Sequence, residues 1–401
     1  MNDPAPSPTR FFQPFTLLAG VGLGLVLLAC AGRTLTSPTW HRDFVRFHPA
    51  ISPEALYQPT IAEMRAIVRA QCRPDQILVV VGGNSIFLGV GQPVEKVWTR
   101  RLQELLGNRY AVVNLAFRGS SPTDAGALVA ESLRGEFPRQ IYLANVPPFT
   151  GASAGGSLAY RFMLLDAHYK GWLLDHPPRV AVLDDYLART DVYPEAREEA
   201  LGARLDAALR FRDFWNGWSF TRFFTFPTRL TAGMDQAFRA RRAFPDLEPD
   251  FEQIPFADRF APRFLTTEME ITRNTSAQFY EPDGAGGWRL NPNEVGHFRR
   301  IAAEAFPEPL KRRTLIVLSR NSPYYTRRLA PAEQARDELA FRDSVAAWQS
   351  LGYQAIEYGP DFTVDDFGDR THLTAAGGQK LARRLAPEVQ AVAARLGYLN
   401  P

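Results

Sequence analysis

The chain of 401 residues is 45% hydrophobic and 22% charged, a composition that is typical of a globular protein with at least one large core. Its formal net charge is only +3 and its basic residues are dispersed, which argues against a nucleic-acid-binding surface. The two cysteines, Cys30 and Cys72, form no CxxC pair, and the sequence contains no HExxH motif. We therefore expect no metal site, no cofactor and no nucleic acid partner.

The first distinctive segment is an apolar, uncharged stretch from Phe15 to Gly32. Its length is close to the roughly 20 residues that a membrane-spanning helix requires. Three interpretations are open: an uncleaved signal anchor, a signal peptide cleaved near Ala29-Cys30-Ala31, or a lipoprotein signal that ends at Cys30. We expect residues 1–33 to form a hydrophobic helix that anchors the protein in a membrane, with the rest of the chain on the periplasmic side. A secreted protein or a lipoprotein is the alternative.

Residues 34–75 are predicted to form a juxtamembrane connector and a helix, because Ile61, Met64, Ile67 and Val68 recur at helical spacing. Apolar runs then alternate with amphipathic stretches in two blocks, 76–150 and 310–401. Alternation of this kind builds a parallel sheet with helices on both faces, so we expect a three-layer α/β/α sandwich. The predicted strands cover 77–81, 110–115, 140–144, 314–318 and 354–358, and the predicted helices cover 94–106, 121–134, 331–351 and 374–396.

Between the two blocks, residues 151–309 do not alternate and are mostly helical by pattern. They are rich in aromatic residues, notably between Phe211 and Phe226, where arginines are interleaved. We interpret this stretch as a helical insertion or cap whose aromatic side chains form its own core. A lid over a functional site and a face that rests on a membrane are the two alternatives.

Candidate catalytic residues stand near the two ends of the alternating pattern. Ser85 follows the first predicted strand in Gly82-Gly83-Asn84-Ser85, and Asp369-Arg370-Thr371-His372 precedes the last predicted helix. A serine hydroxyl becomes a nucleophile when an imidazole accepts its proton, and a carboxylate fixes the tautomer of that imidazole. The sequence thus predicts Ser85 as nucleophile, His372 as base and Asp369 as the orienting acid, with Asp365 or Asp366 as substitutes for Asp369.

Two further residues follow neighbouring strands. Gly119 comes after the second predicted strand and Asn145 after the third. Because reactive groups of open parallel sheets lie at the carboxyl ends of the strands, we expect both residues near Ser85. The N–H groups of Ser85 and Gly119 and the side-chain amide of Asn145 would form an oxyanion hole.

These motifs together resemble those of the SGNH (GDSL-type) hydrolase superfamily, over residues 76–146 and 314–395 but not in the insertion. Gly83-Asn84-Ser85 is similar to the first family block, although the family usually has aspartate in place of Asn84. Asn114 and Gly119 keep the spacing of the second block. The Gly-x-Asn-Asp block retains only Asn145, whereas Asp369 and His372 match the final Asp-x-x-His block.

The resemblance implies an SGNH-hydrolase, flavodoxin-like fold and a serine esterase that forms an acyl-enzyme. Its substrate would be an acyl ester, such as an acetyl ester, or an acylated cell-envelope glycan outside the cytoplasm. One alternative is an O-acyltransferase that modifies cell-envelope polysaccharide, since hydrolysis and transfer share the acyl-enzyme. Another is a non-catalytic envelope protein that keeps the fold as a binding or scaffold module. The acyl group, the acceptor and the oligomeric state do not follow from the sequence.

Overall fold

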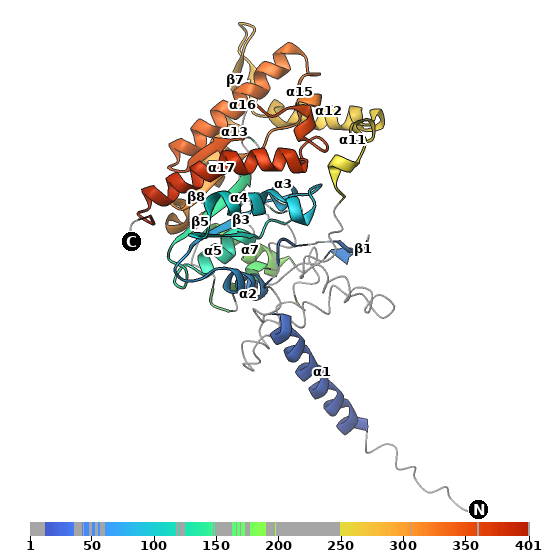
Figure 1. Cartoon of the computed structure of the whole chain (residues 1–401), viewed down its shortest axis with the longest axis vertical. Coiled ribbons are helices and arrows are strands. Elements are labelled where there is room, and N and C mark those ends of the chain that lie inside the picture. Colours follow the sequence, from blue (N-terminus) through green and yellow to red (C-terminus); the bar gives the residue numbers. More distant parts are fainter. Residues whose placement is uncertain are drawn as a thin grey trace, which may run out of the picture.

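A five-stranded parallel sheet forms the centre of the computed structural model (Figure 1). The strands are β3 (Ile77–Gly82), β4 (Tyr110–Asn114), β5 (Gln140–Val146), β8 (Thr314–Leu318) and β9 (Gln354–Glu357), in the order β4-β3-β5-β8-β9. Numbered along the chain this order is 2-1-3-4-5, the flavodoxin-like arrangement. The structure describes residues 13–35, 61–117, 125–146, 177–189, 249–304, 306–358 and 361–399, with a few shorter pieces between them.

Helices cover both faces of the sheet because alternate residues of each strand point in opposite directions. Leu78 and Val80 lie in one apolar cluster with α2 (Ile61–Gln71), α5 (Ala125–Ser132) and α16 (Pro331–Ser350). Ile77 and Val79 lie in a second cluster with α3 (Ser85–Leu88), α4 (Trp98–Leu106) and α17 (Ala375–Arg395). The molecule is therefore a three-layer α/β/α sandwich, and its strands β3 and β5 are buried on both faces.

The predicted elements are present, with shifted ends. The helix expected over 94–106 is divided into η3 (Val94–Lys96) and α4, which begins at Trp98. The Gln92 side chain accepts a hydrogen bond from the Trp98 backbone N–H at 2.9 Å. This contact satisfies one of the N–H groups that a helix start leaves open, so α4 begins later than the apolar pattern suggests.

The N-terminal part of the chain contains two described helices. Residues of α2, the helix predicted within 34–75, are buried in the first apolar cluster, so α2 packs in the sandwich, and the connector role of 34–75 stays a prediction. A helix, α1, covers Gln13–Leu35. None of the helices in the described ranges is long and apolar enough to cross a membrane. A location outside the cytoplasm stays a prediction.

The insertion connects β5 to β8, which are neighbouring strands of the sheet. Besides helices it contains an antiparallel hairpin, which the helical pattern did not predict. The aromatic-rich segment 211–226 lies outside the described residues, so its three interpretations stay predictions. The described elements are α7 (Pro177–Ala188), η4 (Phe251–Gln253), α11 (Phe256–Arg259), α12 (Pro262–Ala277), β6 (Tyr280–Pro282), β7 (Trp288–Leu290), α13 (Pro292–Glu304) and α14 (Glu308–Lys311).

The end of β3 requires glycine. Gly83 has φ +115°, and a Cβ atom there would lie 2.9 Å from the Cβ atom of Asn145 on β5. Both the left-handed backbone and the close approach of the two strands therefore exclude a side chain at position 83. This turn directs the chain from the buried strand into α3, at the edge where the carboxyl ends of the strands lie.

We expect Gly83→Ala to lower the free energy of unfolding by about 2 kcal/mol, since it adds backbone strain and a steric clash. Chemical denaturation measures the change. Gly135→Ala is the control, because Gly135 is exposed and a Cβ atom there would meet nothing within 4 Å. Equal stabilities of the two variants would contradict the argument.

Candidate active site

The short helix α3 holds Ser85 at its first position. Asn84 caps the helix, since its Oδ1 atom accepts a hydrogen bond from the Ile86 backbone N–H at 2.9 Å. At the other end the Phe87 carbonyl accepts hydrogen bonds from the Trp98 indole at 2.8 Å and from the Asn114 amide at 3.2 Å. Asn114, which the family-like spacing singled out, therefore holds the turn that carries the serine.

His372 and Asp369 lie on a compact loop that precedes α17. The Gly368 N–H donates to the His372 carbonyl at 2.8 Å, which closes the loop. One carboxylate oxygen of Asp369, Oδ1, accepts the backbone N–H groups of Thr371 and His372, both at 2.8 Å. These two hydrogen bonds hold the Asp369 carboxylate in place independently of its contact with the His372 imidazole.

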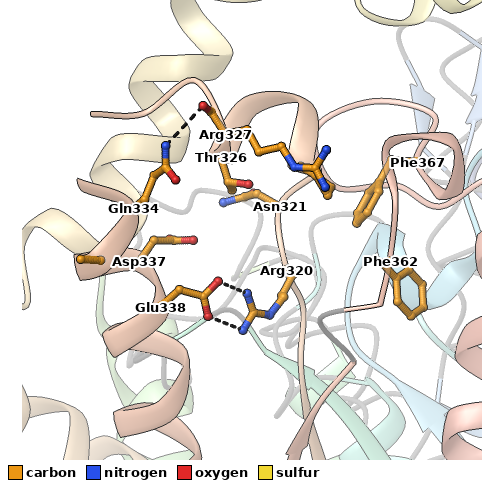
Figure 2. A pocket seen from close by; sticks show the side chains of 11 residues that line it. Arg320, Asn321, Thr326, Arg327, Gln334, Asp337, Glu338, Phe362 and Phe367 are labelled. Carbon is orange, nitrogen blue, oxygen red and sulfur yellow. Dashed lines mark hydrogen bonds and ion pairs between the residues drawn. The ribbon is translucent and has the colours of Figure 1, made fainter. Parts of the chain in front are cut away.

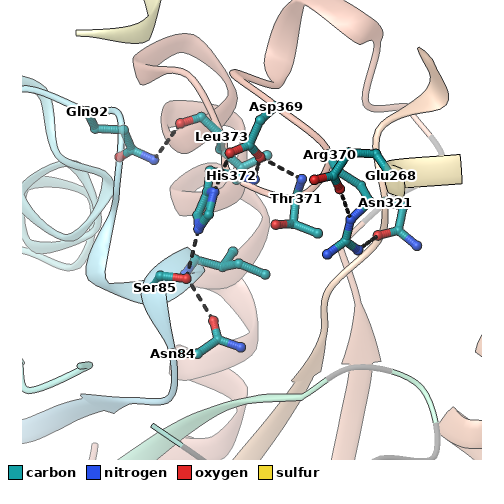
Figure 3. A network of polar contacts seen from close by, with 11 residues as sticks. Asn84, Ser85, Gln92, Glu268, Asn321, Asp369, Arg370, Thr371, His372 and Leu373 are labelled. Carbon is teal, nitrogen blue, oxygen red and sulfur yellow. Dashed lines mark hydrogen bonds and ion pairs between the residues drawn. The ribbon is translucent and has the colours of Figure 1, made fainter. Parts of the chain in front are cut away.

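The structure brings Ser85, His372 and Asp369 together (Figure 3). His372 Nε2 lies 2.8 Å from Ser85 Oγ, and His372 Nδ1 lies 2.6 Å from Asp369 Oδ2. With the ring proton on Nδ1, facing the carboxylate, Nε2 is free to accept the serine proton. Asp366, a suggested substitute for Asp369, instead accepts hydrogen bonds from Thr363 and Lys380. The other, Asp365, is exposed.

The environment of Asp369 favours its charged form. Burial acts to raise the pKa of the carboxyl group, but hydrogen bonds from the His372 ring and from the backbone of His372 and Thr371 outweigh it. The pKa is consequently lower than the ordinary 3.8. A carboxylate that stays ionised can hold the imidazole in one tautomer and stabilise the imidazolium that forms when Nε2 takes a proton.

The three predicted oxyanion-hole donors are not equally placed. The N–H group of Ser85 is at the first position of α3, where a helix provides no intrahelical acceptor. Asn145 is only 1% exposed, and its side-chain amide donates to the Val317 carbonyl at 3.3 Å. Gly119 lies outside the described residues. The roles of Asn145 and Gly119 in an oxyanion hole therefore stay predictions.

A pocket of about 700 Å³ opens at Ser85 and His372. One of its walls is α12 of the insertion, which contributes Ile271 and Asn274. Sequence reasoning missed this wall because no motif marks the insertion residues that face the site. The described lining residues are Asn84, Ser85, Ile86, Ser120, Pro148, Ile271, Asn274, Gln278, Phe279, Ser319, Asn321, Arg370, Thr371 and His372.

A second pocket, of about 300 Å³, shares Asn321 with the first, and Figure 2 shows the residues that line it. On its wall Arg320 donates to both carboxylate oxygens of Glu338, at 2.7 and 2.9 Å. Burial raises the pKa of Asp337 there to about 6. Neither serine nor histidine is among its described lining residues. In the described ranges no cluster of three His, Cys, Asp or Glu side chains is placed to hold a metal ion.

Asp369→Asn should lower the free energy of unfolding at neutral pH, because the ionised carboxylate is stabilised by the contacts of its loop. A carboxyl group with a lowered folded-state pKa contributes stability above its ordinary pKa and loses it as the pH falls through the lowered value. The stabilities of wild type and variant should therefore converge below about pH 4. Urea unfolding over a pH series measures this, with the exposed Asp365→Asn as control. A stability difference between wild type and Asp369→Asn that does not change with pH would contradict this expectation.

The comparisons with known proteins do not assign a family. No protein-family model matches the chain, and no curated protein matches it. Among solved structures, the chain is similar to the native aryl esterase of M. smegmatis, at 15% sequence identity and a TM-score of 0.29. The similarity covers 79% of this chain and 99% of the esterase. At this TM-score it carries no argument, so the function has to be argued from the residues of the site.

Proposed function

We propose that the chain is a serine hydrolase that cleaves ester bonds. The observation that carries this proposal is the series of hydrogen bonds from Ser85 Oγ through His372 to Asp369, at 2.8 and 2.6 Å, beside an open pocket. Nucleophile, base and orienting acid in hydrogen-bond contact are the geometric signature of nucleophilic acyl transfer. The SGNH-like motifs at Ser85 and at Asp369 to His372 support the same reaction class.

In the proposed reaction, His372 Nε2 accepts the hydroxyl proton of Ser85 while Oγ attacks the ester carbonyl carbon. The tetrahedral intermediate collapses when the imidazolium returns that proton to the leaving alcohol, and an acyl-enzyme remains. Water then attacks the acyl carbon while Nε2 takes one of its protons, and Nε2 passes that proton to Ser85 Oγ as the acid leaves. Asp369 remains ionised throughout and holds Nδ1–H.

The oxyanion would accept a hydrogen bond from the Ser85 N–H, which the start of α3 directs outward from the helix. The N–H of Gly119 is the second proposed donor. The Asn145 side chain has two amide N–H groups, of which one donates to the Val317 carbonyl, and the other is the third proposed donor. Donors aimed at the developing negative charge lower the barrier because they need no reorganisation during the reaction.

Transfer of the acyl group to a hydroxyl acceptor, such as that of a cell-envelope glycan, is the second candidate. It is favoured by the polar wall of the pocket, where Asn274, Gln278 and Asn321 present side-chain amides. Amides donate and accept hydrogen bonds and can hold a polyhydroxylated acceptor beside the acyl-enzyme. An acceptor that competes with water needs such a wall, whereas water does not.

Ser85→Ala should lower the rate of p-nitrophenyl acetate hydrolysis by at least about 10³-fold, since the nucleophile is removed. A fluorophosphonate probe should label Ser85 in the wild-type chain and nothing in the variant. Ser350→Ala, at the end of α16 and away from the pocket, is the control with unchanged turnover and labelling. Wild-type turnover in Ser85→Ala would refute the proposed nucleophile.

For acyl transfer, we expect an oligosaccharide acceptor to divert acetyl groups from acetate to acetylated sugar, as measured by mass spectrometry. Gln278→Ala should lower this transfer several-fold more than hydrolysis, because only the acceptor uses the polar wall. Release of acetate alone, at every acceptor concentration, would exclude the second candidate and leave hydrolysis.

A further inference from the structure

One segment of the insertion, residues 250–268, contacts both halves of the Ser-His-Asp arrangement. We propose that this segment, here called the brace, positions the loop of residues 367–376 relative to the turn that carries Ser85. The proposal rests on the proposed function of Ser85, His372 and Asp369. Its central contact is the ion pair between Glu268 on α12 and Arg370, which stands between Asp369 and His372 in the sequence.

Arg370 is held by three hydrogen bonds, and Figure 3 shows the two that its side chain makes. Its Nε atom donates to Glu268 Oε2 at 2.6 Å, and its Nη1 atom donates to Asn321 Oδ1 at 2.7 Å. Its carbonyl oxygen accepts the Ser322 N–H at 2.7 Å. Asn321 and Ser322 are buried beyond the end of β8. The planar guanidinium therefore joins the catalytic loop to the sheet on one side and to α12 on the other.

Three further contacts of the brace reach the same loop. Arg259 donates to the Phe367 carbonyl at 2.8 Å. Glu252 accepts the backbone N–H of Ala376 at 2.8 Å, at the start of α17, where a carboxylate is favourable to a helix N-terminus. The ring of Phe251 lies against Gly368 so closely that a Cβ atom at position 368 would overlap it. The brace thus contacts the loop before, within and after the segment of Asp369 and His372.

The other end of the brace lies beside the turn of Ser85. The Phe251 N–H donates to the Gly91 carbonyl at 3.0 Å, two residues after Gly89, the C-cap of α3. Lys96 in η3 lies 3.6 Å from Glu252 and 3.9 Å from Asp250. The brace adds to a direct contact between the two regions, in which Gln92 donates to the Leu373 carbonyl at 3.3 Å. The brace links the serine turn to the histidine loop across the 287 residues that separate them.

We therefore expect the brace to affect the positions of the catalytic side chains more than the binding of substrate. Glu268 is not among the described lining residues of the pocket, although its partner Arg370 is, so Glu268→Gln removes no lining side chain. A displaced catalytic loop instead lengthens the hydrogen bond between His372 and Ser85, and misplacement of about 1 Å costs up to about 10²-fold in rate. Glu268→Gln removes the negative charge while keeping the shape of the side chain, and Arg370→Lys keeps the charge while losing the fork.

The test combines steady-state kinetics on p-nitrophenyl acetate with hydrogen–deuterium exchange of the full chain. We expect Glu268→Gln to lower kcat at least about 10-fold with little change in KM, and to accelerate amide exchange in the peptide spanning 367–376. The double variant that carries both Glu268→Gln and Arg370→Lys should be no slower than Arg370→Lys alone, since both substitutions break the same contact between residues 268 and 370. Arg273→Gln is the matched control with unchanged kcat: it breaks the exposed 2.7 Å ion pair from α12 to Glu333.

Two results would overturn the proposal. One is unchanged exchange in residues 367–376 of Glu268→Gln, whatever its activity; the other is an effect on KM alone. If the wild-type chain hydrolyses no ester, the exchange measurement still tests whether the brace positions the loop. Faster exchange in Glu268→Gln would then support the brace, while the proposed function would be refuted. If the wild-type chain hydrolyses esters but exchange is unchanged in Glu268→Gln, the brace is refuted and the proposed function stands.

Discussion

The hydrogen bond between Ser85 and His372 joins residues 287 positions apart, and the arrangement of the site depends on it. It can form because both residues are delivered to the same edge of the sheet, one by the end of β3 and the other by the start of α17. A parallel sheet places the carboxyl ends of all its strands at one edge, and the 2-1-3-4-5 order creates a switch point beside its first strand. Gly83 makes the turn into α3 sterically possible, so a backbone requirement at one position underlies the geometry of the reacting atoms.

The polar groups of the site divide into two kinds. His372 and Ser85 face the pocket, and the contacts of Asp369 and Arg370 are chiefly made with the protein itself. Asp369 accepts two backbone N–H groups besides the imidazole, while the charge of Arg370 is neutralised by Glu268. The loop therefore brings a carboxylate and a guanidinium close to the reacting atoms without leaving either charge unpaired. These contacts matter because it costs free energy to remove an unpaired charge from water in a partly buried site.

Much of the sandwich could be predicted from the sequence because β-branched runs such as Ile77 to Val81 have few other structures open to them. Ser85, His372 and Asp369 could be found because short motifs with a chemical rationale surround them. The partner of Arg370 could not be found in this way: Glu268 is 102 residues away, in an insertion without motifs, and only tertiary packing brings the two together. The oxyanion role of Asn145 stays a prediction: its position at a strand end could be predicted, but the hydrogen bond from its amide to the Val317 carbonyl could not.

The late position of His372 in the chain has a consequence for biosynthesis. Every strand of the sheet precedes it, and α17, which follows it, packs against α4 from the first half of the fold. A chain synthesised only as far as β9 therefore contains Ser85 but not His372. Under the proposed function a partly synthesised chain would carry an inert serine, harmless to the esters around it. Ester hydrolysis would then begin only when folding is complete, so the activity itself would report that the whole chain has been made and folded.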